Sequence, residues 1–191
     1  MNAPFRLTAT PEKIRLRVQD YLLLEDHGAF SAYGKTELIE GEIFVVNAIF
    51  SRHAEVTAEL VFSLKTAVIA MKSALRVYSP LSIDLSADSM PEPDIAVCDR
   101  HASGPMPLQK VKLLIEVSDT TLAYDLEEKA KLYAKANIPE YWVADVQGKK
   151  ITRHWQPSED GYRMRDEVAF GAVIDCATLP ALQVETASLI D

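Results

Sequence analysis

Two acids and one lysine occupy positions that the surrounding sequence marks as buried. Glu116 lies in the apolar run VKLLIEV, and Asp94 begins the run DIAVC directly after Pro93. Lys129 falls in the middle of the apolar stripe of the helix expected after the first run. Because a buried charge without a partner is costly, we expect these side chains to meet one another inside the fold.

Paired carboxylates with an amine beside them suit metal-assisted hydrolysis of a phosphodiester. Two carboxylates about 4 Å apart repel by roughly 4 kcal/mol at an effective dielectric constant near 20, and a cation between them relieves this repulsion. Oxygen ligands favour Mg²⁺ or Mn²⁺ over zinc. The lysine could stabilise a developing phosphorane or position the attacking water. The expected metal ligands are therefore Asp94 and Glu116, with Lys129 as their cationic partner.

Four further side chains are candidates for the same site. His53 lies on the inward side of the first turn of an expected helix, and we include it among the catalytic candidates. Glu37 and Glu42 belong to an expected hairpin, where one of them could complete the metal shell, and Asp145 ends a strand. Each has a plainer alternative, as a satisfied core histidine, a solvated hairpin acid or a strand-end cap.

The elements that must position these residues form a strand, helix and strand unit. Residues 111–117 read as a strand buried on both faces, and a helix follows from residues 118–121 to Pro139. A second apolar strand covers residues 140–145. A right-handed crossover would pack the helix on the sheet and turn Lys129 towards the acid.

The preceding segments supply the other side of the site. The short loop between the strand that follows Asp94 and the strand of Glu116 favours antiparallel neighbours, so the two acids could face each other. The other expected elements are a helix from Thr10 to about residue 25, a hairpin at 36–46, a helix at 51–71, strands within 75–85, 151–155 and 162–165, and a short helical turn in the tail.

Composition restricts the classes of protein that are compatible with these motifs. The 191 residues, 48% of them hydrophobic, are enough for one well-buried domain, and no linker divides residues 1–191. The formal net charge of −8 argues against a general affinity for polyanions. Two cysteines are too few for a disulfide framework, and no stretch is apolar enough for a leader or a membrane span. We therefore expect a soluble cytoplasmic protein.

Four features follow one another along the chain, which are PEPDIAV, LLIEVS, a helix with an inward lysine, and PEYWVAD. In this order of features the chain resembles the PD-(D/E)XK nuclease superfamily and, more narrowly, the Uma family of restriction-endonuclease-like proteins. The resemblance covers roughly residues 36–155 and implies an α/β fold with a mixed central β-sheet flanked by helices. Asp94 matches the aspartate of the motif and Glu116 its second acid. The usual lysine position, two residues after the acid, holds Ser118, so the resemblance implies that Lys129 has taken its role.

Two functions follow as expectations. The first is a nuclease that hydrolyses DNA phosphodiester bonds with metal-activated water, with nucleic acid as its partner, no membrane, and a possible homodimer by family likeness. The second is a catalytically inactive binding or assembly module in which Asp94, Glu116 and Lys129 form only a buried ionic network. The net charge of −8 gives the second weight, because affinity for duplex DNA depends largely on phosphate neutralisation.

Overall fold

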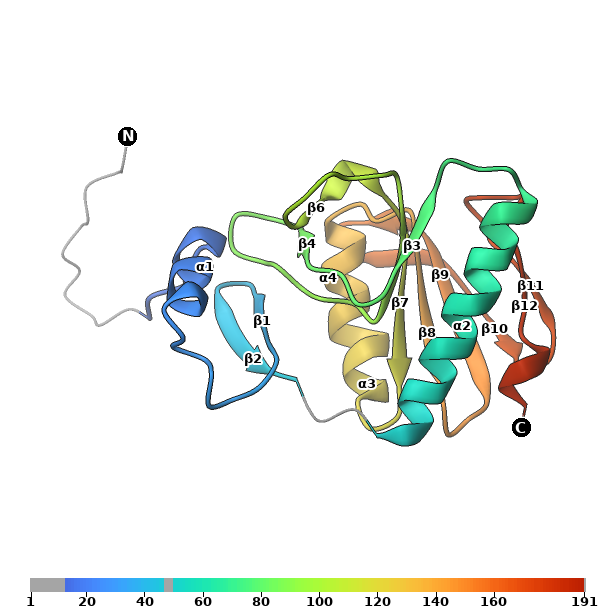
Figure 1. The fold of residues 1–191 in the computed structure, drawn as a ribbon, viewed down its shortest axis with the longest axis horizontal. Helices are drawn as coiled ribbons and strands as arrows, with labels where there is room; N and C mark the ends of the chain where they lie inside the picture. The colour runs from blue at the N-terminus through green and yellow to red at the C-terminus, as the bar shows by residue number, and fades with distance from the viewer. Residues whose placement is uncertain (1–12, 47–49, 191) are drawn as a thin grey trace.

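A mixed six-stranded sheet in the order β10-β9-β8-β7-β5-β3 forms the centre of the protein (Figure 1). The computed structural model describes residues 13–46 and 50–190. Within this sheet only β7 and β8 pair in parallel, while all other neighbours are antiparallel. The strands are β3 (Arg76–Tyr78), β5 (Ile95–Cys98), β7 (Val111–Ser118), β8 (Glu140–Asp145), β9 (Lys150–Ser158) and β10 (Gly161–Ala169). The predicted mixed sheet is confirmed, including the antiparallel pairing of β5 with β7.

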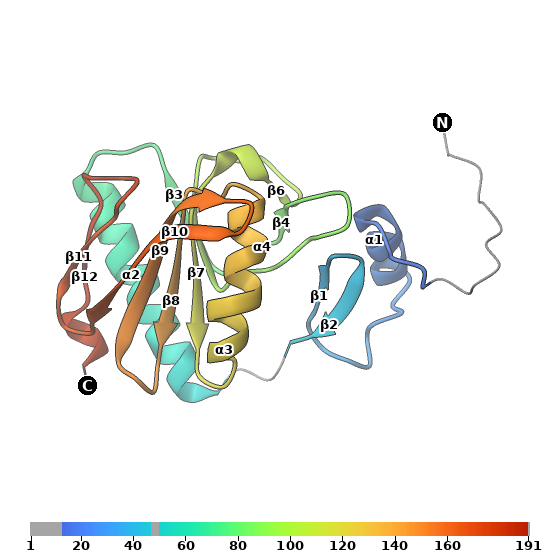
Figure 2. The same cartoon turned by 180° about the vertical axis from the view of Figure 1, so that it is seen from behind.

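Helices cover both faces of this sheet, as the apolar character of β7 on both sides predicts. Helix α2 (Ser51–Ala70) packs against one face, where Leu60 and Leu64 meet the odd-numbered β7 residues such as Ile115. Tyr133 and its helical neighbours pack on the other face with Leu114 (Figures 1 and 2). Glu116 follows Leu114 on this second face, since alternate residues of a strand share a side.

The helical segment between β7 and β8 differs from the single α-helix that the sequence predicts. It consists of α3 (Leu122–Tyr124), a π-helical turn η2 (Asp125–Lys129) and α4 (Ala130–Lys135). The Tyr141 hydroxyl donates a hydrogen bond of 3.1 Å to the carbonyl oxygen of Asp125 within this segment. π-Helical turns occur frequently at functional sites. Here the wide turn buries Asp125 and Lys129 together.

An N-terminal hairpin lies beside the second face of the sheet, next to α4 (Figure 2). Its strands are β1 (Thr36–Ile39) and β2 (Glu42–Val45), as predicted, and its turn has positive φ angles at residues 40 and 41. The loop that leads to Asp94 holds the hairpin in place, since the Met90 amide donates to the Leu38 carbonyl oxygen at 2.7 Å. The hairpin is thereby tied to the start of β5.

The first helix begins later than predicted. Helix α1 comprises Val18–Asp26, and residues 13–17 are not helical. The Leu16 amide bonds to the carbonyl oxygen of Gly41, so this segment follows the hairpin instead of continuing the helix. The predicted start at Thr10 lies outside the described residues.

The remaining elements are short. The C-terminal part adds the hairpin β11 (Val173–Asp175) and β12 (Gln183–Glu185) and the predicted helical turn η3 (Ala187–Leu189). Strands β4 (Ile83–Asp84) and β6 (Met106–Pro107) pair in parallel as a separate two-stranded sheet, and η1 (Leu108–Lys110) follows β6. The sequence did not predict the β11–β12 hairpin. Within residues 13–46 and 50–190 no helix is long and apolar enough to cross a membrane. A single domain over residues 1–191 and a cytoplasmic location stay predictions.

Candidate functional site

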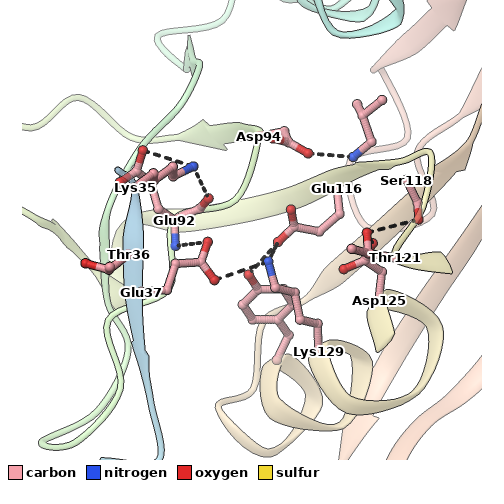
Figure 3. Close-up of polar contacts among 12 residues, drawn as sticks. Lys35, Thr36, Glu37, Glu92, Asp94, Glu116, Ser118, Thr121, Asp125 and Lys129 are labelled. Atoms are coloured by element: carbon pink, nitrogen blue, oxygen red, sulfur yellow. Dashed lines mark hydrogen bonds and ion pairs between the residues drawn. The ribbon is translucent and has the colours of Figure 1, made fainter. Parts of the chain in front are cut away.

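The three charged residues singled out in the sequence line one pocket of about 280 Å³. Asp94 directly precedes β5, Glu116 lies on β7, and Lys129 ends η2. Strand β1 contributes Glu37 to the pocket lining and β2 contributes Phe44 and Val45, and Glu37 points towards Lys129 (Figure 3). Segments that are far apart in the sequence therefore bring these side chains together as predicted.

Lys129 is held between two carboxylates. Its Nζ lies 2.9 Å from Glu116 Oε1 and 3.4 Å from Glu37 Oε2 (Figure 3). Burial disfavours the charged form of this lysine, but Glu116, Glu37 and Asp125 together raise its pKa above the usual value. Lys129 is thus a buried cation whose charge the surrounding acids maintain.

Glu116 receives all of its described hydrogen bonds on one oxygen. Lys129 Nζ and the Tyr133 hydroxyl each donate to Oε1 at 2.9 Å. None of the hydrogen bonds from described residues reaches Oε2, although the side chain is only 5% exposed. This burial raises the pKa of Glu116 to about 8 in spite of the attraction of Lys129. The carboxyl therefore has one free oxygen and a strongly perturbed proton affinity.

Asp94 is fixed through its Oδ2 atom, which accepts from the Val117 amide at 2.8 Å and contacts His53 Nε2 at 3.2 Å. Burial alone would raise the pKa of Asp94, but the hydrogen bonds from His53 and Val117 outweigh it and lower the pKa. The hydrogen bond with Asp94 in turn raises the pKa of His53. His53 thus reaches the site as a partner of Asp94, and no described hydrogen bond occupies Asp94 Oδ1.

The weaker candidates separate into two groups. Glu37 is buried and lines the pocket, where its Oε1 accepts from the Glu92 amide at 3.2 Å. Glu42 is exposed and lies 3.7 Å from Arg15, so it is a solvated hairpin acid without a role in the pocket. Asp145 caps a turn by accepting from the Gly148 amide at 2.7 Å. Glu42 and Asp145 do not line the pocket.

The sequence did not point to three of the charged residues in the pocket, namely Lys35, Glu92 and Asp125. Asp125 is buried and accepts a hydrogen bond of 2.6 Å from Thr121, and burial raises its pKa. Its position four residues before Lys129 on the same helix was a usable signal. Lys35 and Glu92 form an ion pair of 3.2 Å at the pocket, and the sequence gives no signal for either.

The balance of charge in the pocket favours a cation. Five acids line it against two lysines, and these residues are Glu37, Glu92, Asp94, Glu116, Asp125, Lys35 and Lys129. Within the described ranges, no group of three or more His, Cys, Asp or Glu side chains is arranged to hold a metal ion. Mg²⁺ commonly uses only one or two carboxylates and completes its octahedron with waters and substrate phosphates. The free oxygens of Asp94 and Glu116 fit such a site.

Comparison with known proteins places the chain in a family. A family model for Uma2, described as "Putative restriction endonuclease", matches residues 18–187. The chain belongs to the Uma2 family. This Uma2 chain also shares its fold with a crystal structure described as "a putative nuclease belonging to DUF820" from Anabaena variabilis ATCC 29413. The TM-score is 0.66 at 16% identity, covering 91% of this chain and 97% of that one. No curated protein matches the chain.

Membership of Uma2 confirms the family resemblance on which the expectation of a nuclease rested. The likeness to the Anabaena structure supports the fold alone, because the two sequences share only 16% of their residues.

Proposed function

We propose that this Uma2 chain is a divalent-metal-dependent nuclease that hydrolyses DNA phosphodiester bonds. The observation that carries the proposal is the pair Asp94 and Glu116, a half-buried and a buried carboxylate in one pocket that each keep one oxygen free of described hydrogen bonds. Carboxylate oxygens that accept no described hydrogen bond are available to a cation, and the pocket that they line also contains the buried Lys129. Membership of a family described as a restriction endonuclease supports phosphodiester chemistry.

Asp94 Oδ1 and Glu116 Oε2 would hold Mg²⁺ or Mn²⁺. When bound, such an ion supplies Lewis-acid stabilisation of the phosphate and lowers the pKa of a coordinated water. His53 and the Val117 amide fix Asp94 through its other oxygen and keep the carboxylate ionised. His53 thus acts as a positioning residue for the metal ligand.

Lys129 is the group that stabilises negative charge on the reacting phosphate. Its ammonium keeps a second partner in Glu37, 3.4 Å away, so it stays charged and oriented when Glu116 engages an ion. A preorganised cation in a water-poor pocket is more effective than one in bulk water, because the local dielectric constant is lower. Glu37 therefore holds the ammonium group of Lys129 in position.

The inactive binding or assembly module is the second candidate. The direct ion pair of 2.9 Å between Lys129 and Glu116 favours it, since that contact satisfies both charges without any chemistry. The net charge of −8 also favours it, because it opposes DNA binding. On this alternative, Asp94 and His53 form only a further structural pair.

Metal binding separates the two candidates. Titration calorimetry with Mn²⁺ should detect binding to the wild-type protein, and Mn²⁺ should raise its melting temperature by mass action. Glu116→Ala should weaken binding by more than about 100-fold because a charged ligand is lost. Glu42→Ala removes an exposed acid outside the pocket and is the matched control. Unchanged Mn²⁺ affinity in Glu116→Ala contradicts the assignment of the site.

Cleavage tests the chemistry itself. Lys129→Met should lower the rate of DNA cleavage by about 100- to 1,000-fold while Mn²⁺ still binds, because transition-state stabilisation is lost and the metal ligands remain. A wild-type protein that binds Mn²⁺ but cleaves no DNA supports the binding module instead. The homodimer expected from the family likeness stays a prediction, and sedimentation velocity measures it.

A further inference from the structure

We propose that Phe44 and Tyr124 form a stacking platform for a nucleobase and that the site accepts an unpaired nucleic-acid strand. The inference rests on the proposed nuclease function and names the substrate class of the same pocket. Both aromatic residues line that pocket together with Asp94, Glu116 and Lys129.

The two rings come from elements on opposite sides of the pocket. Phe44 belongs to β2 of the hairpin and Tyr124 ends α3, yet their ring centroids lie 6.1 Å apart with an interplanar angle of 37°. Phe44 pairs directly with Glu37 across the hairpin, and such partners project from the same face. Because Glu37 reaches Lys129 from this face, Phe44 is directed towards the same pocket.

This aromatic pair is accessible, unlike the aromatic residues beneath it. Phe44 is 38% exposed and its neighbour Val45 is 53% exposed, whereas Tyr133 and Tyr141 are fully buried in the core. The pocket therefore has an apolar wall of Phe44, Val45 and Tyr124 facing a charged wall with the two metal-ligand candidates. A nucleotide has the same division, since its base is flat and apolar on both faces and its phosphate is charged.

Charge favours an unpaired strand over a duplex. Affinity for duplex DNA comes mainly from lysines and arginines that neutralise phosphates. The chain carries a net charge of −8, and its pocket has five acids and only two lysines, Lys35 and Lys129. Stacking on an aromatic ring needs no such charge and is available to every base. A paired base already stacks on its neighbours and must be extruded first, so the unpaired strand binds at lower cost.

Fluorescence anisotropy in EDTA tests this inference without cleavage. The probes are a labelled 12-nucleotide DNA of mixed sequence, the RNA of the same sequence, and the DNA duplex. We expect at least one unpaired strand to bind about tenfold or more tightly than the duplex. Phe44→Ala and Tyr124→Ala should each weaken that binding by about 5- to 100-fold, while Phe44→Trp should retain it.

Matched variants keep the result interpretable. Phe62→Ala removes a phenylalanine that is 68% exposed on α2 and does not line the pocket, and it should leave the affinity unchanged. Phe44→Leu keeps an apolar contact in the hairpin but lacks a π-face, and it should weaken binding even where Phe44→Ala unfolds. Circular dichroism and the melting temperature verify folding. If the unpaired RNA binds more tightly than the unpaired DNA, the stacking platform stands and the preferred strand contains ribose.

Two outcomes overturn the inference. One is a duplex that binds as tightly as both unpaired strands, and the other is unchanged affinity in folded Phe44→Leu and Tyr124→Ala. If the wild-type protein cleaves DNA but substitutions of Phe44 leave its affinity for the unpaired strand unchanged, the stacking platform is wrong and the nuclease function stands. Binding that depends on Phe44 without any cleavage in Mn²⁺ overturns the nuclease function alone.

Discussion

Two buried glutamates on neighbouring parallel strands have opposite surroundings. Glu140 begins β8 and is completely buried, and five neutral donors from the Trp142, Cys176, Ala177 and Thr178 groups saturate both of its oxygens. Glu116 on β7 has a lysine and a tyrosine on one oxygen, and its other oxygen is free of described hydrogen bonds in a pocket. The two glutamates are therefore similarly buried, but Glu140 has both oxygens hydrogen-bonded and Glu116 has only one.

The difference separates an acid that serves the fold from one that is free to serve the proposed chemistry. The donors of Glu140 belong largely to residues 176–178, so this carboxylate fastens the C-terminal part of the chain to the sheet. A carboxylate with all its hydrogen bonds made has no capacity for a ligand. Glu116 has kept that capacity, and it forms an ion pair of 2.9 Å with Lys129, whereas no described ion pair involves Glu140.

Removing each acid gives the largest expected contrast. Glu140→Ala removes five hydrogen bonds, leaves the buried Trp142 and Cys176 donors unpaired, and should lower the free energy of unfolding by about 3 kcal/mol or more. Glu116→Ala should lower it by less than about 1.5 kcal/mol, because Lys129 keeps Glu37 as its partner. Urea denaturation measures both values. Equal losses of stability would remove the distinction between the two acids.

The partner of Asp94 provides the next contrast. His53→Ala removes the 3.2 Å contact that holds Asp94 and should weaken Mn²⁺ binding by about 10- to 100-fold, the usual effect of losing a group that orients a metal ligand. Calorimetry measures the affinity, and the melting temperature of the metal-free protein serves as the control. Unchanged Mn²⁺ affinity would leave His53 with a structural role only.

The proton affinity of Glu116 predicts a pH dependence. Protons compete with metal ions for a carboxylate, so Mn²⁺ affinity should rise by up to about tenfold per pH unit between pH 6 and 8 and level off above the pKa of about 8. The raised pKa also means that this group stabilises the fold fully below pH 4.5, and that this contribution is lost as the pH rises through about 8. A flat profile of Mn²⁺ affinity against pH would contradict the first effect, and a free energy of unfolding that does not fall between pH 4.5 and 8 would contradict the second.

The smallest effect on metal affinity and stability is expected for Glu42, an acid that the β1–β2 hairpin exposes to solvent. Glu42 lies 3.7 Å from Arg15 at the surface, and exposed ion pairs contribute between about 0 and 1 kcal/mol. Glu42→Ala should therefore change neither Mn²⁺ affinity nor, beyond about 1 kcal/mol, the free energy of unfolding. A large loss of Mn²⁺ affinity in this variant would show that Glu42 contributes to the metal site.

The sequence predicted the centre of the site because burial of charge is a local signal. A glutamate in a strand that is apolar on both faces needs a partner, and the helix periodicity turns Lys129 towards it. The pairing of β5 with β7 followed from a short connection, which brought Asp94 into place. The rest depends on contacts between distant segments.

Long-range contacts decide what the local pattern leaves open. Glu37 and Glu42 are alike in sequence, but the bond between Met90 and Leu38 fixes how the hairpin lies, and so buries Glu37 and exposes Glu42. The π-helical turn that buries Asp125 has no signature in an apolar pattern that fits an ordinary α-helix equally well. The late start of α1 likewise follows from a bond to the hairpin.

The π-helical turn η2 makes chain length, and not only residue type, a variable of this site. Wide turns of this kind accommodate one additional residue within a helix. Deleting a single residue there would restore regular α-helical winding and rotate the preceding part of the helix by about 100° relative to α4. Tyr124 and Lys129 would then no longer face the same cavity, so related chains that differ by one residue in this segment should differ in what their pockets can bind.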